Sequence, residues 1–246
     1  MDTLVISNEK DYARIPKIIK LFQKQETPEN LIRHKKIINS KQEIICVSMA
    51  HIRMIAKAIQ KGGCDTFLSI AKTKNKEDEF YEETLIQGLV IAGLKDTNRQ
   101  MKEFEWWTLK IDNWSTCDST VSTMKSLKKI KDKNDCFEFY LKLCFSEKEF
   151  VARFGIVVLM TYFLEEKYID KIIEMCKKVS REDYYIQMAE AWLLSFVFIK
   201  FKEQAYKLFA EKTLSKFVQN KAISKCRDSF QVSTEDKEWL VDFRIK

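Results

Sequence analysis

Residues that break helices are scarce in this chain of 246 residues. It contains only two prolines, Pro16 and Pro28, and five glycines. From residue 29 onward, no proline removes a backbone N–H donor from a helix. The same scarcity leaves few turn-forming residues for a fold built from many short strands. The sequence therefore predicts an all-α protein.

Apolar residues recur at the spacing of one helix face through most of the sequence. The i, i+3, i+4, i+7 pattern is clear in the set Ile52, Ile55, Ala56 and Ile59. A serine three residues ahead of a carboxylate, the sequence pattern of a capping box, precedes three helical segments at Ser146, Ser180 and Ser233. We predict helices at residues 10–23, 28–38, 48–61, 64–73, 77–94, 98–109, 114–127, 133–145, 147–165, 168–178, 183–200, 202–212, 216–229 and 234–241.

These helices are separated by short polar breaks, and no linker stands out between them. A succession of helical hairpins of this kind is typical of α-solenoids, in which each helix pair buries its inner face on its neighbours. The pattern predicts a single domain of HEAT-like repeats over residues 1–246. At 46% hydrophobic residues, the chain can bury a sizeable core.

The charge balance is moderately basic, with 43 Lys and Arg against 36 Asp and Glu and a formal net charge of +7. Such an excess suits a polyanionic partner but equally fits a solvated, lysine-rich surface. The basic clusters at residues 33–36 and 125–131 leave the same two interpretations open, because either a phosphate track or an exposed helix face would carry them.

Three absences narrow the function classes. The seven cysteines are scattered singly and odd in number, which indicates reduced thiols and a cytoplasmic protein. With only His34 and His51 as histidines, the sequence predicts no metal site and no cofactor. The most apolar run, residues 154–164, is about half as long as the roughly 20 residues of a membrane span. No membrane association is expected.

Four residues have informative spacings. Trp114 and Asp118 are four residues apart, which puts them on one helix face. Arg153 follows Asp118 by 35 residues, and Trp192 follows Arg153 by 39 residues. HEAT and armadillo units run to about 40 residues, so equivalent helices of successive units can project these side chains onto one concave surface.

The segments around these residues resemble a known family. Residues 111–118 (Ile-Asp-Asn-Trp-Ser-Thr-Cys-Asp), 151–154 (Val-Ala-Arg-Phe) and 188–192 (Met-Ala-Glu-Ala-Trp) are similar to the three signature segments of the AlkD-like DNA alkylation repair family, in the same order and spacing. The resemblance covers roughly residues 28–230 and is strongest over 105–200. It implies a HEAT-like solenoid whose concave groove cradles duplex DNA.

The resemblance also implies an activity, namely hydrolysis of the N-glycosidic bond of positively charged N3- and N7-alkylated purines such as 3-methyladenine and 7-methylguanine. Asp118 would be the catalytic carboxylate, and Trp114 and Trp192 would pack against the deoxyribose of the damaged nucleotide. Arg153 would contact the adjacent phosphate. The family resemblance further implies that the damaged base is not flipped into a pocket.

Each implied role has a physical reason. A cationic purine is already a good leaving group, so no general acid is needed to protonate it. As the bond breaks, the sugar becomes oxocarbenium-like, and the carboxylate of Asp118 would stabilise this charge and orient the attacking water. The indole faces of Trp114 and Trp192 would add cation–π attraction, and Arg153 would supply bidentate phosphate recognition.

A weaker match lies nearer the N-terminus, where residues 45–57 resemble the family's Gly-Val-x-x-Pro-x-x-Arg segment. It makes Arg53 a candidate contact to the DNA backbone. Cys46 and Ala50 stand where the family has Gly and Pro. This departure leaves open the geometry of the loop before the helix that carries Arg53.

The expected partner is double-stranded DNA that contains alkylated purines, bound by a monomer in a base excision repair pathway. Two alternatives remain. A non-catalytic HEAT-like protein that recognises damaged or unusual DNA would bind in a salt-dependent way without forming abasic product. A scaffold for proteins or peptides would show little affinity for DNA at physiological salt.

Overall fold

The computed structural model describes residues 2–23, 27–179 and 181–246, and over these ranges the protein is helical. They contain no β-strand beyond an isolated bridge between Gln23 and Val47. The all-α prediction is therefore confirmed.

The α-helices are α1 (Glu9–Tyr12), α2 (Ile15–Leu21), α3 (Pro28–Ile38), α4 (Met49–Gly62), α5 (Asp65–Thr73), α6 (Tyr81–Ala92), α7 (Thr97–Trp107), α8 (Trp114–Val121), α9 (Asn134–Leu143), α10 (Glu149–Tyr162), α11 (Ile169–Lys178), α12 (Tyr184–Lys200), α13 (Lys202–Glu211), α14 (Lys216–Asp228) and α15 (Thr234–Trp239). Short 3₁₀ helices are η1 (Lys76–Asp78), η2 (Lys125–Lys128) and η3 (Leu240–Phe243).

The chain divides into two compact units, Met1–Lys131 and Asp132–Lys246. We call them unit 1 and unit 2. Within each unit, helices pack on their sequence neighbours and next-but-one neighbours, which is the repeat-like arrangement of an α-solenoid. The predicted fold class is thus confirmed, whereas a single domain over residues 1–246 stays a prediction.

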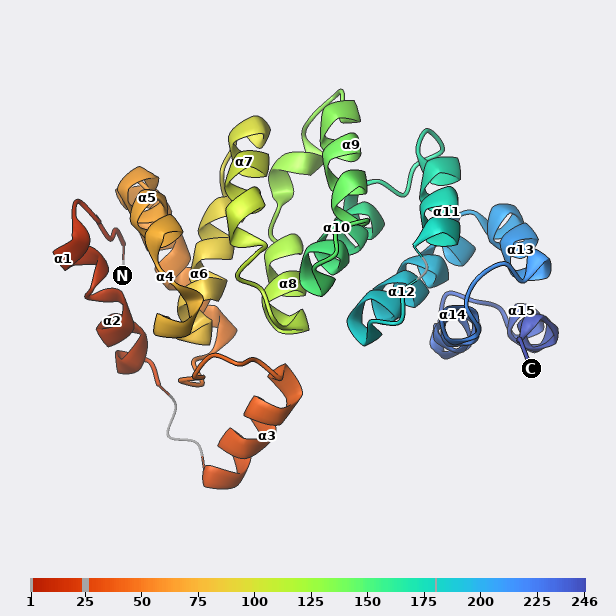
Figure 1. Cartoon of the computed structure of the whole chain (residues 1–246), viewed down its shortest axis with the longest axis horizontal. Helices are drawn as coiled ribbons and strands as arrows, with labels where there is room; N and C mark the ends of the chain where they lie inside the picture. Colours follow the sequence, from red (N-terminus) through yellow and green to blue (C-terminus); the bar gives the residue numbers. More distant parts are fainter. Residues whose placement is uncertain (1, 24–26, 180) are drawn as a thin grey trace. The chain divides into compact units, whose positions relative to one another are not determined.

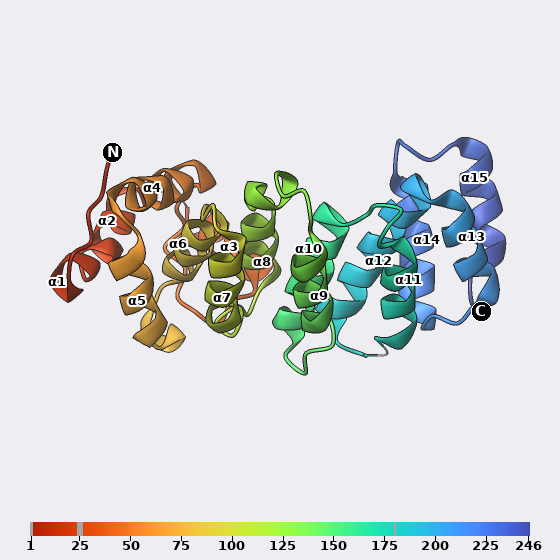
Figure 2. The ribbon, with the colours of Figure 1, turned by 90° about the horizontal axis from the view of Figure 1, so that it is seen from above.

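Unit 1 is organised around α6, whose residues are all buried. This helix packs between α4 and α8, and α7 covers it and also contacts α5 (Figures 1 and 2). The indole Nε1 of Trp107 donates to the carbonyl of Thr84 at 2.9 Å. A Cβ atom at Gly88 would lie 2.1 Å from the ring of Trp107, so only glycine lets this ring lie against α6.

Unit 2 repeats the same arrangement with α10 and α12 at its centre. α10 packs against α9 and α12, and α12 packs against α13 and α14 (Figures 1 and 2). A Cβ atom at Gly155 of α10 would lie 2.7 Å from the carbonyl oxygen of Tyr140 in α9, so glycine permits the close approach of these two helices. Within unit 2, α12 therefore packs between α10 and α14.

Two predicted helices are interrupted. The segment 10–23 forms α1 and α2, because Pro16 in the first turn of α2 has no N–H to continue the helix from α1. The segment 114–127 ends as an α-helix at Val121. The side-chain hydroxyls of Ser122 and Thr123 donate to the carbonyl of Ser119 at 2.8 and 3.0 Å, and they compete for the acceptor that the next helical N–H would use.

The predicted capping signals differ in outcome. Ser233 is the N-cap of α15 and accepts a hydrogen bond from the backbone N–H of Asp236. Ser146 instead accepts from the backbone N–H of Lys148, and it lies before the N-cap position of α10. Ser180 lies outside the described residues. Within the described ranges, no helix has the length and apolarity needed to cross a membrane.

Candidate nucleic-acid interface

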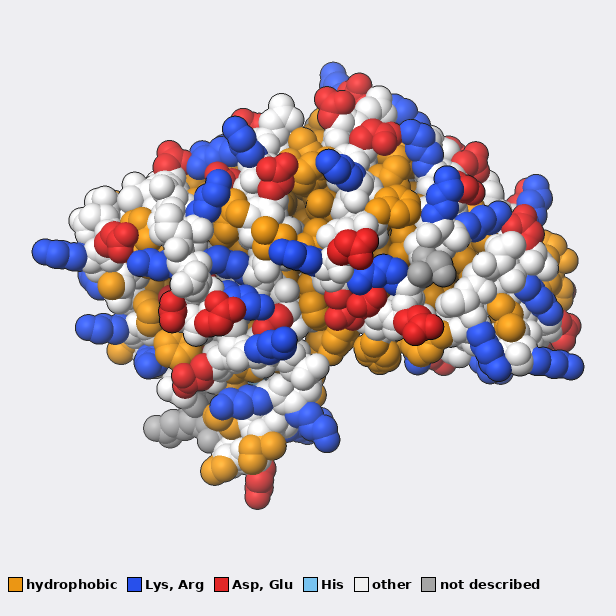
Figure 3. Space-filling model, in the orientation of Figure 1, with side chains coloured by type: hydrophobic (Ala, Val, Ile, Leu, Met, Phe, Trp, Pro, Cys, Tyr) orange, Lys and Arg blue, Asp and Glu red, His pale blue; other side chains and the backbone are white. Residues whose placement is uncertain are grey.

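Basic and acidic side chains alternate over the face of the protein drawn in Figure 3. The excess positive charge is therefore not gathered into one unbroken surface on that face. A site for a polyanion has to be sought in local groups of cations, beginning with the elements that carry the sequence-predicted residues.

The start of α8 is firmly held. Asn113, its N-cap, is 1% exposed, and its side-chain oxygen accepts from the backbone N–H of Thr116 at 2.9 Å. The preceding Asp112 accepts from the hydroxyl of Ser40 at 2.8 Å and from the backbone N–H of Lys41 at 3.0 Å. Because both residues are anchored, the first residue of α8, Trp114, has a defined position.

Trp114 is half-buried, and its indole Nε1 donates to the backbone carbonyl of Ile37 in α3 at 2.9 Å. In Figure 1, α3 lies apart from the packed helices of unit 1, and most of its described side chains are exposed. This hydrogen bond uses the only polar atom of the indole, so further contacts of the ring are made by its π faces and edges.

Asp118 lies one helical turn after Trp114 in α8 and is also half-buried. Side chains four residues apart in an α-helix are neighbours on the same face. Unit 1 therefore holds an aromatic ring and a carboxylate side by side on α8, as the sequence spacing indicates.

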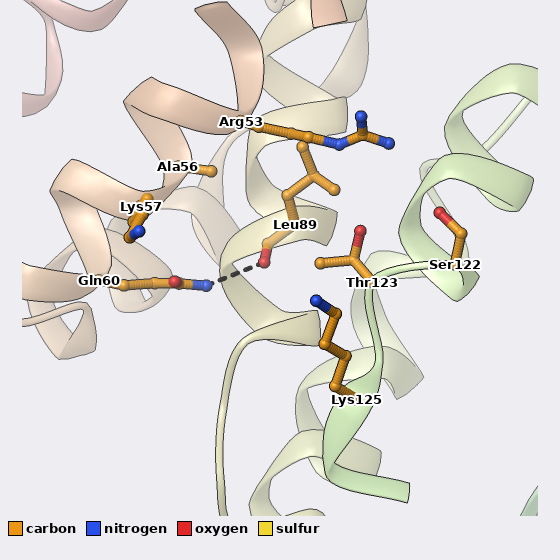
Figure 4. A pocket seen from close by; sticks show the side chains of 8 residues that line it. All are labelled: Arg53, Ala56, Lys57, Gln60, Leu89, Ser122, Thr123 and Lys125. Atoms are coloured by element: carbon orange, nitrogen blue, oxygen red, sulfur yellow. Dashed lines mark hydrogen bonds between the residues drawn. The ribbon is translucent and has the colours of Figure 1, made fainter. Parts of the chain in front are cut away.

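A pocket of about 490 Å³ lies between α4 and the segment that follows α8 (Figure 4). In Figure 4, the side chains of Arg53 and Lys125 extend from opposite sides toward the gap between these elements. The described residues that line it include three cations and two hydroxyls but no carboxylate; they are Arg53, Ala56, Lys57, Gln60, Leu89, Ser122, Thr123 and Lys125. We call this the α4–α8 pocket. Its chemistry suits an anion such as a phosphate.

The loop before α4 contains Cys46, which stands where the family has glycine. The backbone φ of Cys46 is 69°, which is the left-handed region that glycine adopts most easily. The buried carboxylate of Glu82 accepts the backbone N–H groups of Cys46 at 2.8 Å and Ile45 at 3.1 Å. These bonds hold a cysteine in the conformation expected of the family's glycine, and α4 begins normally after its N-cap, Ser48.

In unit 2, Arg153 is more enclosed than a contact to an external phosphate would suggest. It is 5% exposed, and its Nη1 donates to the backbone carbonyl of Tyr185 at 2.9 Å. The guanidinium carbon lies 5.9 Å from the centre of the Tyr185 ring. The backbone N–H of Tyr185 donates in turn to Glu149 at 2.9 Å. Arg153 thus occupies a fixed position between α10 and the start of α12.

Trp192 in α12 is half-buried and lies near a cation that the sequence analysis did not single out. The Nζ of Lys225 in α14 lies 6.0 Å from the centre of the Trp192 ring. Burial lowers the pKa of Lys225, and the positive charges of Lys221 and Arg153 lower it further. Unit 2 therefore brings Arg153, Trp192 and Lys225 into one neighbourhood.

The family model of the DNA alkylation repair enzymes matches residues 18–226 of the chain. The chain belongs to the DNA alkylation repair enzyme family. Searches of curated proteins and of solved structures gave no significant match. Membership in this DNA repair family supports a role in DNA repair and binding to DNA.

All five residues selected from the sequence lie within the part that matches the family. Unit 1 holds Trp114 and Asp118 on α8, and it places Arg53 in the pocket formed just beyond the end of that helix. Unit 2 holds Arg153 and Trp192 together with Lys225.

The residues that sequence reasoning missed have weak local signals. The helix pattern over residues 114–127 predicts a continuous helix that includes Ser122 and Thr123, and in the sequence Lys125 is one member of a basic cluster. Lys225 is one of many lysines in a lysine-rich chain, and only the packing of α14 beside α12 distinguishes it. In the described part of the chain, no group of three or more His, Cys, Asp or Glu side chains is arranged to hold a metal ion.

Proposed function

We propose that this member of the family is a DNA glycosylase that hydrolyses the N-glycosidic bond of positively charged N3- and N7-alkylated purines in duplex DNA. The observation that carries the proposal is the pairing of Trp114 and Asp118 on α8, with the cationic α4–α8 pocket at the end of the same helix. An aromatic face, a carboxylate and an anion site match the sugar, the developing cation and the phosphate of one nucleotide.

In the proposed reaction, the bond between C1′ and the purine nitrogen breaks, and its electron pair neutralises the positive charge of the departing base. The carboxylate of Asp118 stabilises the oxocarbenium-like sugar and orients a water molecule. The water oxygen bonds to C1′, and its proton passes by way of Asp118 to solvent. The products are a free alkylated base and an abasic site.

The other residues position the DNA. As the family resemblance implies, the π faces of the Trp114 and Trp192 indoles would contact the deoxyribose and favour its positive charge by roughly 0.5–2 kcal/mol each. Arg53 and its pocket neighbours would bind a backbone phosphate, and Arg153 would contact the phosphate beside the lesion. The protein would act as a monomer in the cytoplasm, and the damaged base would stay outside any base-sized pocket.

The deciding experiment compares release of 7-methylguanine from methylated duplex DNA by the wild type and by Asp118→Asn. We expect the variant to be slower by about 10²–10³-fold, the usual effect of removing one group that stabilises transition-state charge. Its affinity for the same duplex, measured at matched salt, should stay within a few-fold of the wild type, because the substitution preserves shape. Release at the wild-type rate by the variant would refute the role of Asp118.

Lesion charge gives a second, independent readout. The mechanism depends on a cationic leaving group, so a duplex that contains uracil, a neutral base, should yield no detectable product under conditions that release 7-methylguanine completely. Efficient uracil release would exclude the proposed mechanism.

A non-catalytic protein that binds damaged or unusual DNA is the second candidate. The observation in its favour is that the α4–α8 pocket and the Arg153–Lys225 neighbourhood provide cations for binding and do not themselves require chemistry. This candidate is supported if the wild type and Asp118→Asn both bind duplex DNA and neither releases any base.

A further inference from the structure

A second cationic pocket lies in unit 2, and none of the five residues selected from the sequence lines it. Its volume is about 530 Å³. It is formed by one side of α14 and the chain segment that follows η3, and its lining residues are Lys216, Phe217, Asn220, Lys221, Ser224 and Arg244. We call it the α14 pocket. Arg244 lies outside residues 18–226, so this pocket includes a part of the chain that the family model does not cover.

The segment that carries Arg244 is tied to α14 by paired hydrogen bonds. The side-chain amide of Asn220 donates to the carbonyl of Ile245 at 2.8 Å, and its oxygen accepts the backbone N–H of Ile245 at 2.9 Å. Gln219 donates to the carbonyl of Phe243 at 2.6 Å. These contacts fix the backbone on both sides of Arg244, so its position is built into the fold.

The guanidinium of Arg244 is also directed. Its Nη2 donates to the hydroxyl of Ser224 at 3.0 Å, while its Nε is enclosed and has no hydrogen-bond partner among the described residues. An arginine held in this way loses little side-chain entropy when it binds an anion.

The cations of the α14 pocket are not neutralised. Within the described ranges, Lys216, Lys221 and Arg244 form no ion pair, and no carboxylate lines the pocket. Lys221 is one helical turn from Lys225, whose pKa is lowered first by burial and then by the positive charges of Lys221 and Arg153. Asp228 is the acidic group that acts on Lys225 from the same helix. A group of cations that repel one another favours binding of an anion.

The cations of α14 extend toward Trp192, the residue of unit 2 that is proposed to contact the deoxyribose. Phe217, Lys221 and Lys225 follow one another at four-residue intervals, which places them on one face of α14. At the end of this line, Lys225 lies over the ring of Trp192. The ten residues from Lys216 to Lys225 span about 13 Å of helix, which corresponds to the axial rise of roughly four nucleotides in one strand of B-DNA.

Two exposed aromatic rings accompany the cations. Phe217 is 39% exposed and Tyr184 is 56% exposed, and their ring centres are 6.2 Å apart. Large aromatic side chains left in solvent beside lysine and arginine are typical of surfaces that contact the sugars and bases of a nucleic-acid strand.

We infer that the α14 pocket binds backbone phosphates of the DNA strand and extends the interface from Trp192 by about four nucleotides. Lys216, Lys221 and Arg244 contact the phosphates, and Phe217 contacts the adjoining sugar. The inference rests on the DNA binding in the proposed function. It does not depend on excision, and the two fail in different experiments.

The test removes charge from the pocket in the full-length protein with the double substitution Lys221→Gln and Arg244→Gln. The matched control, Lys178→Gln with Lys207→Gln, removes the same charge from exposed positions of α11 and α13. Affinity for an unmodified duplex is measured over a range of salt concentrations. Each lost phosphate contact lowers the slope of log affinity against log salt by about 0.9, so the double variant should lose about 1.8 and the control nothing.

A further measurement makes the result specific. Two duplexes are prepared that each contain a lesion, one with the flank on the 5′ side and one with the flank on the 3′ side shortened to fewer than about four base pairs. On one of these two duplexes the shortened flank does not reach the α14 pocket, so the wild type and the double variant should bind it equally well. The single variant Lys221→Gln, at an exposed position, serves if the double variant does not fold.

Several outcomes would overturn the inference. One is an unchanged salt slope in the double variant, and another is an equal loss in the control. A third uses pyrophosphate as the probe. If the double variant loses pyrophosphate binding but keeps the wild-type salt slope on DNA, the pocket serves a free anion instead of the DNA backbone.

Discussion

Cys46 illustrates how a single residue is kept in a backbone conformation that its own side chain disfavours. In the left-handed region a non-glycine residue is less stable by roughly 1–2 kcal/mol, and here the hydrogen bonds from the N–H groups of Cys46 and Ile45 to Glu82 offset that strain. The hydrogen bonds of the loop to the buried carboxylate of Glu82 determine this backbone conformation. The residue type at position 46 changes only how stable the conformation is.

We therefore expect Cys46→Gly to change the free energy of unfolding by less than about 1 kcal/mol. The relieved strain and the greater entropy of the unfolded glycine chain nearly cancel. Cys46→Val introduces a side chain of similar size that is β-branched, and it should lower the free energy of unfolding by about 1–2 kcal/mol relative to the wild type. Urea unfolding measures both, and equal stabilities for the two variants would contradict the assignment of strain to this position.

Glu190 is a second residue whose surroundings determine its behaviour. It is 1% exposed in α12, and neither carboxylate oxygen has a hydrogen-bond partner among the described residues. Burial raises its pKa to about 8. Near neutral pH the folded protein therefore holds Glu190 mostly in its uncharged form, although it lies only two residues from Trp192.

The pH dependence of stability follows from this shift. Between the ordinary glutamate pKa of about 4.3 and the folded pKa of about 8, the folded state binds a proton that the unfolded chain has released. Stability from this group is therefore present below that window and is lost as pH rises through it. Glu190→Gln removes this loss. From about pH 5 to about pH 8, the unfolding free energy of the variant should therefore fall less steeply than that of the wild type.

Chemical unfolding of the wild type and Glu190→Gln at several pH values provides the measurement. Glu83, whose pKa burial raises to about 7, titrates in the same range in both proteins, so the difference between the two curves isolates Glu190. Parallel curves would show that Glu190 is already charged in the folded protein.

At the scale of elements, a buried polar network joins the N-terminal helices of unit 1. Lys110 donates to Glu79 and to the carbonyl of Ala71, both at 2.8 Å, and so links the end of the α7 segment to α5 and η1. Tyr12 of α1 and Gln87 of α6 donate to the same carboxylate at 3.0 and 2.6 Å. The network satisfies polar groups that helix packing alone would leave unpaired.

Removing one partner from this network should be costly. Lys110→Met leaves the buried charge of Glu79 without its cation, and we expect a loss of about 3–5 kcal/mol in unfolding free energy. The double substitution Lys110→Met with Glu79→Gln should recover part of that loss. As a control, Lys171→Met breaks an exposed ion pair with Glu138 and should cost less than about 1 kcal/mol. Similar losses for both lysines in urea unfolding would be inconsistent with a buried ion pair.

On the scale of the whole molecule, the net charge of +7 is a weaker guide than the grouping of cations. Acidic and basic side chains are mixed on the face shown in Figure 3, whereas the α4–α8 pocket combines three cations with no lining carboxylate among the described residues. DNA affinity should therefore depend on a few positions and not on the total charge.

Accordingly, Arg53→Gln with Lys57→Gln should lower the salt slope of duplex binding by about 1.8, the effect of two lost phosphate contacts. Lys72→Gln with Lys102→Gln removes the same charge from exposed positions of α5 and α7 in unit 1 and should leave the slope unchanged. Fluorescence anisotropy with an unmodified duplex measures both. Equal slopes for the two double variants would mean that net charge, and not the pocket, determines binding.

The sequence alone determined the helical class, most helix positions and the placement of Trp114 and Asp118 on one face of α8. These are local properties, because a helix pattern and a four-residue spacing depend only on residues within a few turns of one another. The family resemblance was also carried by short local segments, and the match over residues 18–226 confirms it.

Only the tertiary structure decided where α8 ends, how Arg153 is enclosed and which lysines form pockets. Ser122 and Thr123 end the helix through hydroxyl bonds to Ser119, and the loop they begin faces Arg53, about 70 residues earlier in the chain. Arg244 reaches Ser224 through the fold of the C-terminal segment. A pocket is made by contacts between elements distant in sequence, and no periodicity within a single element contains that information.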